Sequence, residues 1–95
     1  MPGTSENKLP PQPPETADPD TKEEYRFEVA KSKALEDPEV KRLKDKADLA
    51  STDEESRVAL RAYNRALFEK IRKLDPGVSD YANQIEKAML KRLGE

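Results

Sequence analysis

Four arginines and one phenylalanine between residues 57 and 72 have the clearest potential for binding chemistry. They are Arg57, Arg61, Arg65, Phe68 and Arg72. At 100° per residue of a helix, the five positions lie within an arc of about 80°. A guanidinium binds carboxylates and phosphates through paired hydrogen bonds, and an aromatic ring can stack on a base. This arginine stripe is therefore a candidate surface for phosphate, RNA or an acidic protein partner.

Three interpretations of the arginine stripe stay open. In the one we favour, the guanidinium groups lie beside the core and pair with carboxylates of the first and second helices. In the second, the stripe binds a protein partner. Nucleic acid is the least favoured partner, because nucleic-acid-binding domains typically have a pI above about 9. This chain has a pI of 5.3 and no recognition motif.

Residues that commonly carry catalysis are missing. The 95 residues include no Cys and no His, which excludes thiol nucleophiles, Ser-His-Asp catalysis and the Glu-x-x-His di-iron site of helical bundles. The chain has no Gly-rich phosphate loop and no nucleophile elbow, so nothing marks an Asp, Glu, Lys or Tyr as catalytic. We therefore expect a protein without enzyme activity, cofactor or small-molecule substrate.

Acidic side chains are dense where the predicted helical region begins, at Asp18, Asp20, Glu23 and Glu24. They lack the Gly and the terminal bidentate Glu of an EF-hand loop, so we expect no dedicated metal site. Charge is also uneven along the chain, with a net −6 over residues 1–56 and +4 over 57–95. This asymmetry indicates that oppositely charged helical faces attract each other, within one molecule or between two.

The first 20 residues hold six of the eight prolines. Proline removes a backbone donor and fixes φ, so residues 1–20 are predicted to form a disordered or polyproline-like tail or tether. Within this tail, "KLPPQPP" (residues 8–14) matches the basic-x-x-Pro-x-x-Pro pattern of SH3 ligands, although we favour a spacer. No apolar run approaches the ~20 residues of a transmembrane segment, and no signal peptide is visible.

Four amphipathic segments follow, at about residues 22–35, 38–50, 53–74 and 78–93. Thr21 with Glu24, and Thr52 with Glu55, form capping boxes at two of the predicted starts. The pairs Asp37-Pro38 and Asp75-Pro76 each combine a helix cap with a proline suited to the first helical position. We predict an all-α domain over residues 21–95, built as a small antiparallel bundle of three or four helices.

The third segment has the strongest apolar pattern, and its spacings of 3, 4, 4 and 3 assign five residues to the core: Leu60, Tyr63, Leu67, Ile71 and Leu74. Phe68 and Leu90 fall outside the main stripes of their segments. Each is either an exposed contact for a partner or packs against a third neighbour in the bundle.

The stretches "DPEVKRLKDKAD" (residues 37–48) and "ALRAYNRALFEKIRKLDP" (59–76), separated by an acidic break and followed by a last amphipathic helix, form one pattern. Over roughly residues 30–93 the chain resembles small exported helical proteins of unknown function from Gram-negative bacteria. The resemblance implies a periplasmic or surface location, with the Pro-rich segment as a tether after a removed signal peptide. Without such a removed peptide, the expected location is cytoplasmic. The resemblance implies no activity.

The function that these features favour is a non-catalytic helical module with a structural or protein-interaction role. Its partner would be another protein or a second copy of the chain in a homodimer. The alternative is a binder of nucleic acid or of an acidic partner through the arginine stripe.

Overall fold

The computed structural model describes residues 11–94, which form helices and no strand. The elements are α1 (Pro19–Ala34), α2 (Pro38–Asp48), α3 (Asp53–Leu74), the 3-10 helix η1 (Pro76–Val78) and α4 (Ser79–Arg92). The prediction of an all-α bundle of helices is confirmed. None of these helices is both long enough and apolar enough to cross a membrane, within the part of the chain described.

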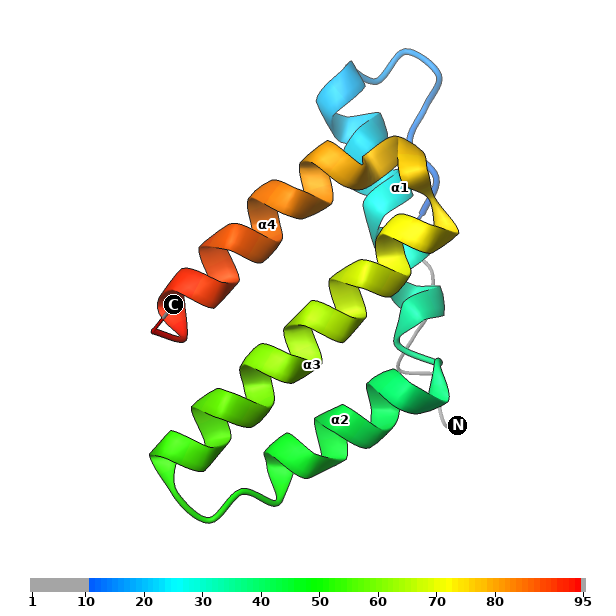
Figure 1. Cartoon of the computed structure of the whole chain (residues 1–95). Coiled ribbons are helices and arrows are strands. Elements are labelled where there is room, and N and C mark those ends of the chain that lie inside the picture. Colours follow the sequence, from blue (N-terminus) through cyan, green and yellow to red (C-terminus); the bar gives the residue numbers. More distant parts are fainter. Residues whose placement is uncertain (1–10, 95) are drawn as a thin grey trace.

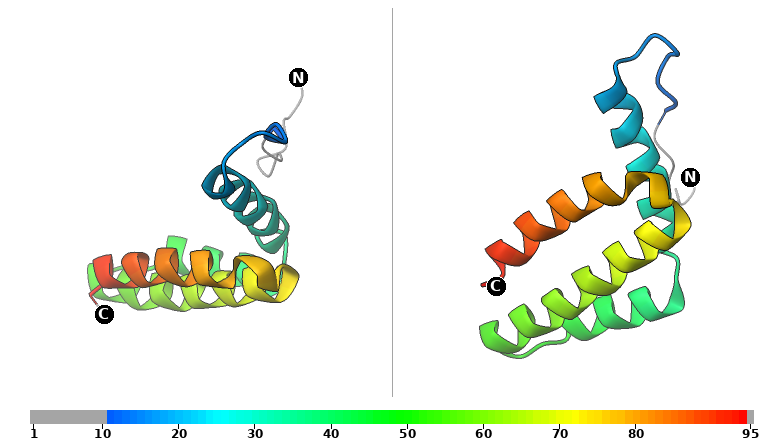
Figure 2. Two further views of the ribbon diagram at one scale, coloured as in Figure 1. Left: turned by 90° about the horizontal axis from the view of Figure 1, so that it is seen from above. Right: turned by 45° about the horizontal axis from the view of Figure 1, so that its top comes forward.

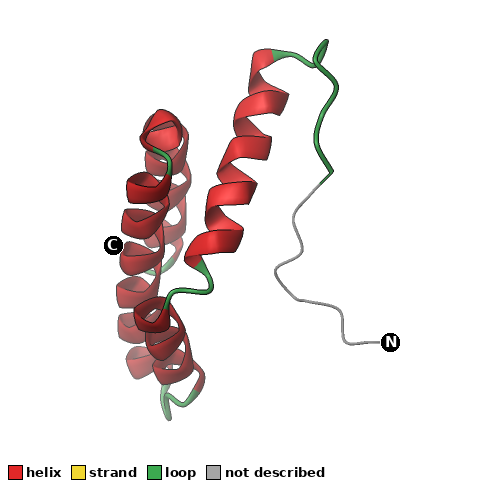
Figure 3. Ribbon diagram, turned by 90° about the vertical axis from the view of Figure 1, so that its right-hand side faces the viewer, coloured by secondary structure: helices red, strands yellow, loops and turns green. Residues whose placement is uncertain are grey.

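The helix α3 is the centre of the molecule, with α2 along one side and α4 along the other (Figure 1). Seen from above or edge-on, α2, α3 and α4 form one layer, and α1 leans out of it (Figures 2 and 3). Short connections explain the layer, because helices joined by a few residues pack as antiparallel neighbours. The α1 helix crosses one face of this layer and contacts α3, η1 and α4.

The first helix begins earlier than the sequence pattern predicted. Pro19 is its first residue, and the Asp18 carboxylate accepts a hydrogen bond from the Thr21 backbone N–H at 2.7 Å. The expected start at Lys22, with Thr21 as the cap, is therefore wrong. Asp18-Pro19 repeats the cap-then-proline chemistry of Asp37-Pro38. Residues 19 and 20, which were predicted to belong to the tail, are part of α1, and residues 8–10 of the Pro-rich motif lie outside the described residues.

Hydrogen bonds confirm the predicted caps at Asp37 and Thr52. The Asp37 carboxylate accepts from the backbone N–H groups of Glu39 and Val40, at 3.0 and 3.2 Å. The Thr52 hydroxyl accepts from the Glu55 N–H at 3.1 Å. Asp75 caps η1, and α4 then starts one residue later than predicted. The helix α2 ends two residues before its predicted end, which is within the usual uncertainty of helix boundaries.

The core lies where α1 crosses α3 and the start of α4. Its buried members are Phe27, Ala30, Ala34, Val40, Leu67, Phe68, Ile71, Val78 and Ala82. The Phe27 ring stacks on Phe68 at 6.0 Å and meets Tyr81 edge-on at 5.2 Å, both between ring centroids. Phe68 is 1% exposed, so of its two alternatives the structure has the packed one.

The position of Leu74 differs from the prediction, which placed this side chain in the core. It is 42% exposed, whereas Ile71 on the preceding turn is fully buried. The two positions are about 60° apart around α3, and α1 crosses on the side of Ile71. Leu74 instead lines a shallow pocket beside α1, with Tyr25 and Val29.

Two ion pairs connect α3 and its C-cap to the middle of α1 and to the corner between α1 and α2. The Arg26 guanidinium donates two hydrogen bonds to the Asp75 carboxylate, at 2.6 and 3.1 Å. The Lys70 ammonium lies 3.4 Å from Asp37 Oδ1, at the corner between α1 and α2. Hydrogen bonding from the Val40 backbone, together with Lys70, holds the pKa of Asp37 below its ordinary value of 3.8 against the opposing effect of desolvation.

Replacing Phe68 with alanine tests the assignment of this ring to the core. The Phe68→Ala variant should lose about 3–5 kcal/mol of unfolding free energy, because a cavity remains beside Phe27. The Phe68→Leu variant should lose less and keeps the measurement possible if the alanine variant does not fold. Urea unfolding followed by circular dichroism measures both, with Leu74→Ala as a partly exposed control. Equal losses at residues 68 and 74 would contradict the burial described here.

The cap at Asp37 predicts a dependence of stability on pH. Because folding lowers the pKa of Asp37, its contribution is fully present above the ordinary pKa and is lost as the pH falls through the folded-state pKa. An Asp37→Asn variant keeps a capping oxygen but does not titrate there. Urea unfolding between about pH 5 and pH 2 should therefore show a smaller loss of stability for this variant than for the wild type. An NMR titration that placed the Asp37 pKa at or above 3.8 would refute the assignment.

Candidate protein-interaction site

Two members of the arginine stripe bind α4. Arg72 Nη1 donates hydrogen bonds to Asn83 Oδ1 at 3.0 Å and to Glu86 Oε1 at 2.7 Å. Arg61 Nη1 donates to the carbonyl oxygen of Leu93 at 2.5 Å. Leu93 caps the C-terminus of α4, where the helix dipole favours a positive charge. These two arginines hold α4 against α3 at two points along its length.

The other three members of the stripe are Arg57, Arg65 and Phe68. They do not form one exposed surface, because the Phe68 ring is buried. Arg57 is exposed, and its guanidinium lies 3.9 Å from Glu54 on its own helix. Arg65 is also exposed. Phe68 is inside the core, so its proposed role as a contact for a partner is wrong. The structure separates the five predicted site residues into two that bind α4, two on the surface and one in the core.

Arg72 pairs with a helix other than those expected. Carboxylates of the first two helices were the predicted partners of the stripe, but Arg72 binds Glu86 of α4. The turn over residues 75–78 brings α4 back along the side of α3 that carries the arginine stripe. The helix α1 carries four acidic and four basic side chains. Its ion pair with the end of α3 has the opposite polarity, because Arg26 of α1 binds Asp75, the C-cap of α3.

An open groove lies between α2 and the first half of α3. Its volume is about 700 Å³, and its lining residues are Arg42, Leu43, Asp45, Lys46, Leu49, Ala50, Glu54, Glu55, Val58, Ala59 and Ala62. Six of them are apolar, and the five charged ones are all exposed. We call this surface the α2–α3 groove. The helix hairpin creates it, since α2 turns into α3 through only four residues, 49–52.

The groove holds two large apolar side chains that no helix of the bundle covers. Leu49 is 81% exposed and Val58 is 50% exposed. Leu49 follows the last residue of α2, and Val58 lies on the second turn of α3. The sequence analysis missed both, although both fall outside the apolar stripes of their helices. A position outside the apolar stripe identified Phe68 and Leu90 in the sequence. The same criterion would have identified Leu49 and Val58.

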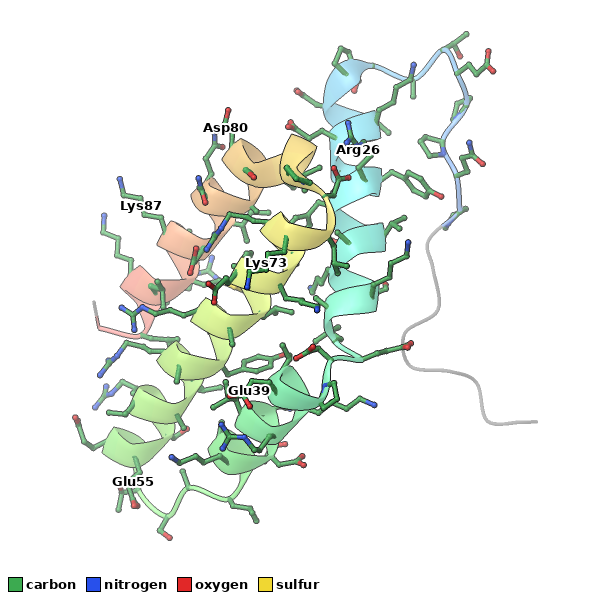
Figure 4. All side chains as sticks on the ribbon, turned by 45° about the vertical axis from the view of Figure 1, so that its right-hand side comes forward. Arg26, Glu39, Glu55, Lys73, Asp80 and Lys87 are labelled. Carbon is green, nitrogen blue, oxygen red and sulfur yellow. The ribbon has the colours of Figure 1, made fainter. Side chains whose placement is uncertain are left out.

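The groove opens on the face of the layer opposite α1. Val58 and Ala62 lie about 140° and 180° around α3 from Ile71. Ile71 packs in the core with residues of α1, including Phe27. The helix α1 therefore cannot cover the groove. Glu55, on its rim, lies at the end of the molecule away from Arg26 and Asp80 (Figure 4).

The rim of the groove carries opposite charges on its two sides. The α2 side presents Arg42 and Lys46, with Asp45 beside them, and the α3 side presents Glu54 and Glu55. Arg42 is paired with Glu39 on its own helix at 2.7 Å. Among the described residues, no carboxylate forms an ion pair with Lys46. The groove thus combines an apolar floor with a basic and an acidic wall.

The predicted acidic cluster gathers at the opposite end of the molecule. Asp18, Asp20, Glu23 and Glu24 surround a shallow depression with Asp80 and Tyr81. Burial raises the pKa of the Tyr81 hydroxyl, and the carboxylate of Glu24 raises it further. Within residues 11–94 no group of three or more Asp, Glu, His or Cys is arranged to hold a metal ion.

The arginine contacts to α4 generate a prediction. The Arg72→Ala variant leaves Glu86, whose side chain is 15% exposed, without its partner and should lose about 1–3 kcal/mol of unfolding free energy. Amide hydrogen exchange should quicken in α4 more than in α2. The control is Arg57→Ala, which should change stability by less than about 0.5 kcal/mol. Equal exchange rates in α4 of the two variants would contradict the role assigned to Arg72.

Comparison with family models, with curated proteins and with solved structures finds no match to this chain.

Proposed function

We propose that this protein is a non-catalytic helical module that binds another protein surface through the α2–α3 groove. The observation that carries the proposal is the exposure of Leu49 and Val58 over an apolar floor. Contiguous apolar surface that the fold itself leaves open is typical of sites that bind other proteins. Full burial of an aliphatic side chain of this size stabilises a complex by roughly 1.5–3 kcal/mol.

The shape of the groove favours a protein partner over a small molecule. Small-molecule sites enclose most of their ligand and direct a few polar groups at it. The α2–α3 groove is open along its length, and its charged residues stand exposed at the rim. An apolar centre with a polar rim is the usual anatomy of a protein–protein interface.

The alternative, binding of nucleic acid or an acidic partner through the arginine stripe, has less support. The Arg61 guanidinium donates a hydrogen bond to Leu93, and the Arg72 guanidinium donates to Asn83 and Glu86. A phosphate would have to compete with these contacts for the same guanidinium groups. We therefore assign Arg61 and Arg72 to the packing of α4 and the binding function to the groove.

Site-specific photo-crosslinking tests the proposed function. A benzoylphenylalanine at Ala62, on the groove floor, should form an adduct of defined mass when the protein is irradiated alone or in an extract of its native host. The same group at Lys87, which points away from the bundle on α4 (Figure 4), is the control and should form none. A Leu49→Asp change should abolish the adduct, because it removes the most exposed apolar side chain of the groove.

The proposal fails if the Ala62 position gives no adduct in either sample. It also fails if the adduct persists in the Leu49→Asp background. Circular dichroism should show the same helix content for the wild type and Leu49→Asp, since Leu49 is 81% exposed and contributes little to the core. An adduct that survives these controls identifies a contact made through the groove.

A further inference from the structure

We infer that the partner bound by the α2–α3 groove is a second copy of this chain, in a dimer whose two-fold axis runs parallel to the groove. The inference rests on the proposed function and names its partner. The charges on the two walls of the α2–α3 groove, and the positions of these charges along the helix hairpin, support a dimer. The alternative occupants are outcomes of the experiment below.

The basic wall and the acidic wall stand at the same height. Lys46 lies two residues before the end of α2, and Glu55 lies two residues after the start of α3. Because the two helices are antiparallel and joined by a short loop, both residues are less than one turn from the loop. A molecule turned over about the groove axis therefore places its Lys46 opposite Glu55 of the first molecule.

The side chains on these walls face the groove rather than the far side of each helix. Around α2, Lys46 lies about 60° from the lining residue Leu43, whereas Asp45 lies about 160° from it. Around α3, Glu55 lies about 20° from Ala62. Asp45 therefore lies at the outer edge of the α2 wall, and Lys46 is the charged α2 side chain that a partner in the groove would contact.

The two-fold symmetry doubles each contact. In an isologous dimer the pair formed by Lys46 of one copy and Glu55 of the other occurs twice. The same rotation lays α2 of one copy over α3 of the other, which brings the Leu49 and Val58 side chains of both copies into the interface. Leu49 lies three residues from Lys46 toward the loop and Val58 lies three residues from Glu55 away from it, so these side chains flank the level of the two ion pairs. Ala59 and Ala62 are small enough to let the helices approach closely.

The other face-to-face arrangement is disfavoured by charge. A two-fold axis across the groove would lay α2 over α2 and α3 over α3. Arg42 and Lys46 of one copy would then face Lys46 and Arg42 of the other, and the acidic walls would also face each other. Like charges placed opposite each other in an interface select against that geometry.

Sedimentation equilibrium of the full chain tests the dimer. The wild type should change reversibly from the chain mass of 10.8 kDa toward twice that mass between about 10 µM and about 1 mM. Val58→Asp should remain a monomer over this range. Lys46→Glu and Glu55→Lys alone should each raise the dissociation constant about tenfold or more, because each converts two attractive pairs into repulsive ones. Lys87→Glu, on the far edge of α4, makes the same charge change and should have no effect.

Charge exchange makes the test specific for this geometry. An equimolar mixture of Lys46→Glu and Glu55→Lys chains should dimerise as the wild type does, because every facing pair is again opposite in sign. The double variant carrying both changes should also dimerise with itself. Circular dichroism at low concentration confirms that each single variant is folded.

The outcomes separate this inference from the proposed function. A wild-type chain that stays monomeric at about 1 mM overturns the dimer, and a Lys46→Glu variant that self-associates more tightly overturns its geometry in favour of α2 over α2. If the Ala62 photo-crosslink then joins a different protein and still depends on Leu49, the interaction function stands without the dimer. If no adduct forms at all, both fail.

Discussion

Burial of Phe68 against Phe27 is the contact on which the arrangement of the four helices depends. The layer of α2, α3 and α4 can form from neighbouring helices, but α1 joins it only by crossing one face. The buried residues of α1 are Phe27 and two alanines, so one ring supplies most of its apolar contact. That ring meets Phe68 of α3 and Tyr81 of α4. This aromatic contact therefore decides where α1 lies and which face of the layer it covers.

Ion pairs around this core connect α3 or its C-cap to the other helices or their caps. Arg26 binds Asp75, Lys70 binds Asp37, and Arg72 binds Glu86. Each pair connects α3, or the residue that ends it, to a different element. The two more exposed pairs, Arg26–Asp75 and Lys70–Asp37, contribute little free energy, so their main effect is on orientation. The arginine stripe, which first suggests a binding surface, belongs in part to this set of internal contacts.

The α2–α3 groove follows from the same arrangement. A chain of this length cannot cover both faces of a helical layer, because its ratio of surface to volume is high. The single crossing helix α1 covers the core face, where Phe27 and Ile71 pack, and leaves the other face open. Leu49 and Val58 remain exposed on that open face. The proposed dimer would bury these side chains and would join the basic wall of each groove to the acidic wall of its partner.

The helices and most of their ends could be predicted from the amino-acid sequence. Caps and prolines act through hydrogen bonds within three or four residues, so Asp37, Thr52 and Asp75 could be identified without a tertiary structure. The same rule, applied to Asp18-Pro19, would have placed the start of α1 correctly. The apolar spacing of α3 also predicted the burial of Leu67 and Ile71. These features depend on residues that are close together in the chain, so short sequence patterns predict them.

Which helix covers which face of the layer could be seen only once the helices were placed in three dimensions. Periodicity marks an apolar stripe but does not say how far a crossing helix extends along it, so Leu74 is exposed and Phe68, outside the stripe, is buried. The partner of Arg72 depends on the path of α4, which returns beside α3 after the turn at residues 75–78. The groove likewise exists only because residues of α2 and α3 meet across the hairpin. Contacts between elements depend on their relative placement, and that placement is set by the packing of the whole chain.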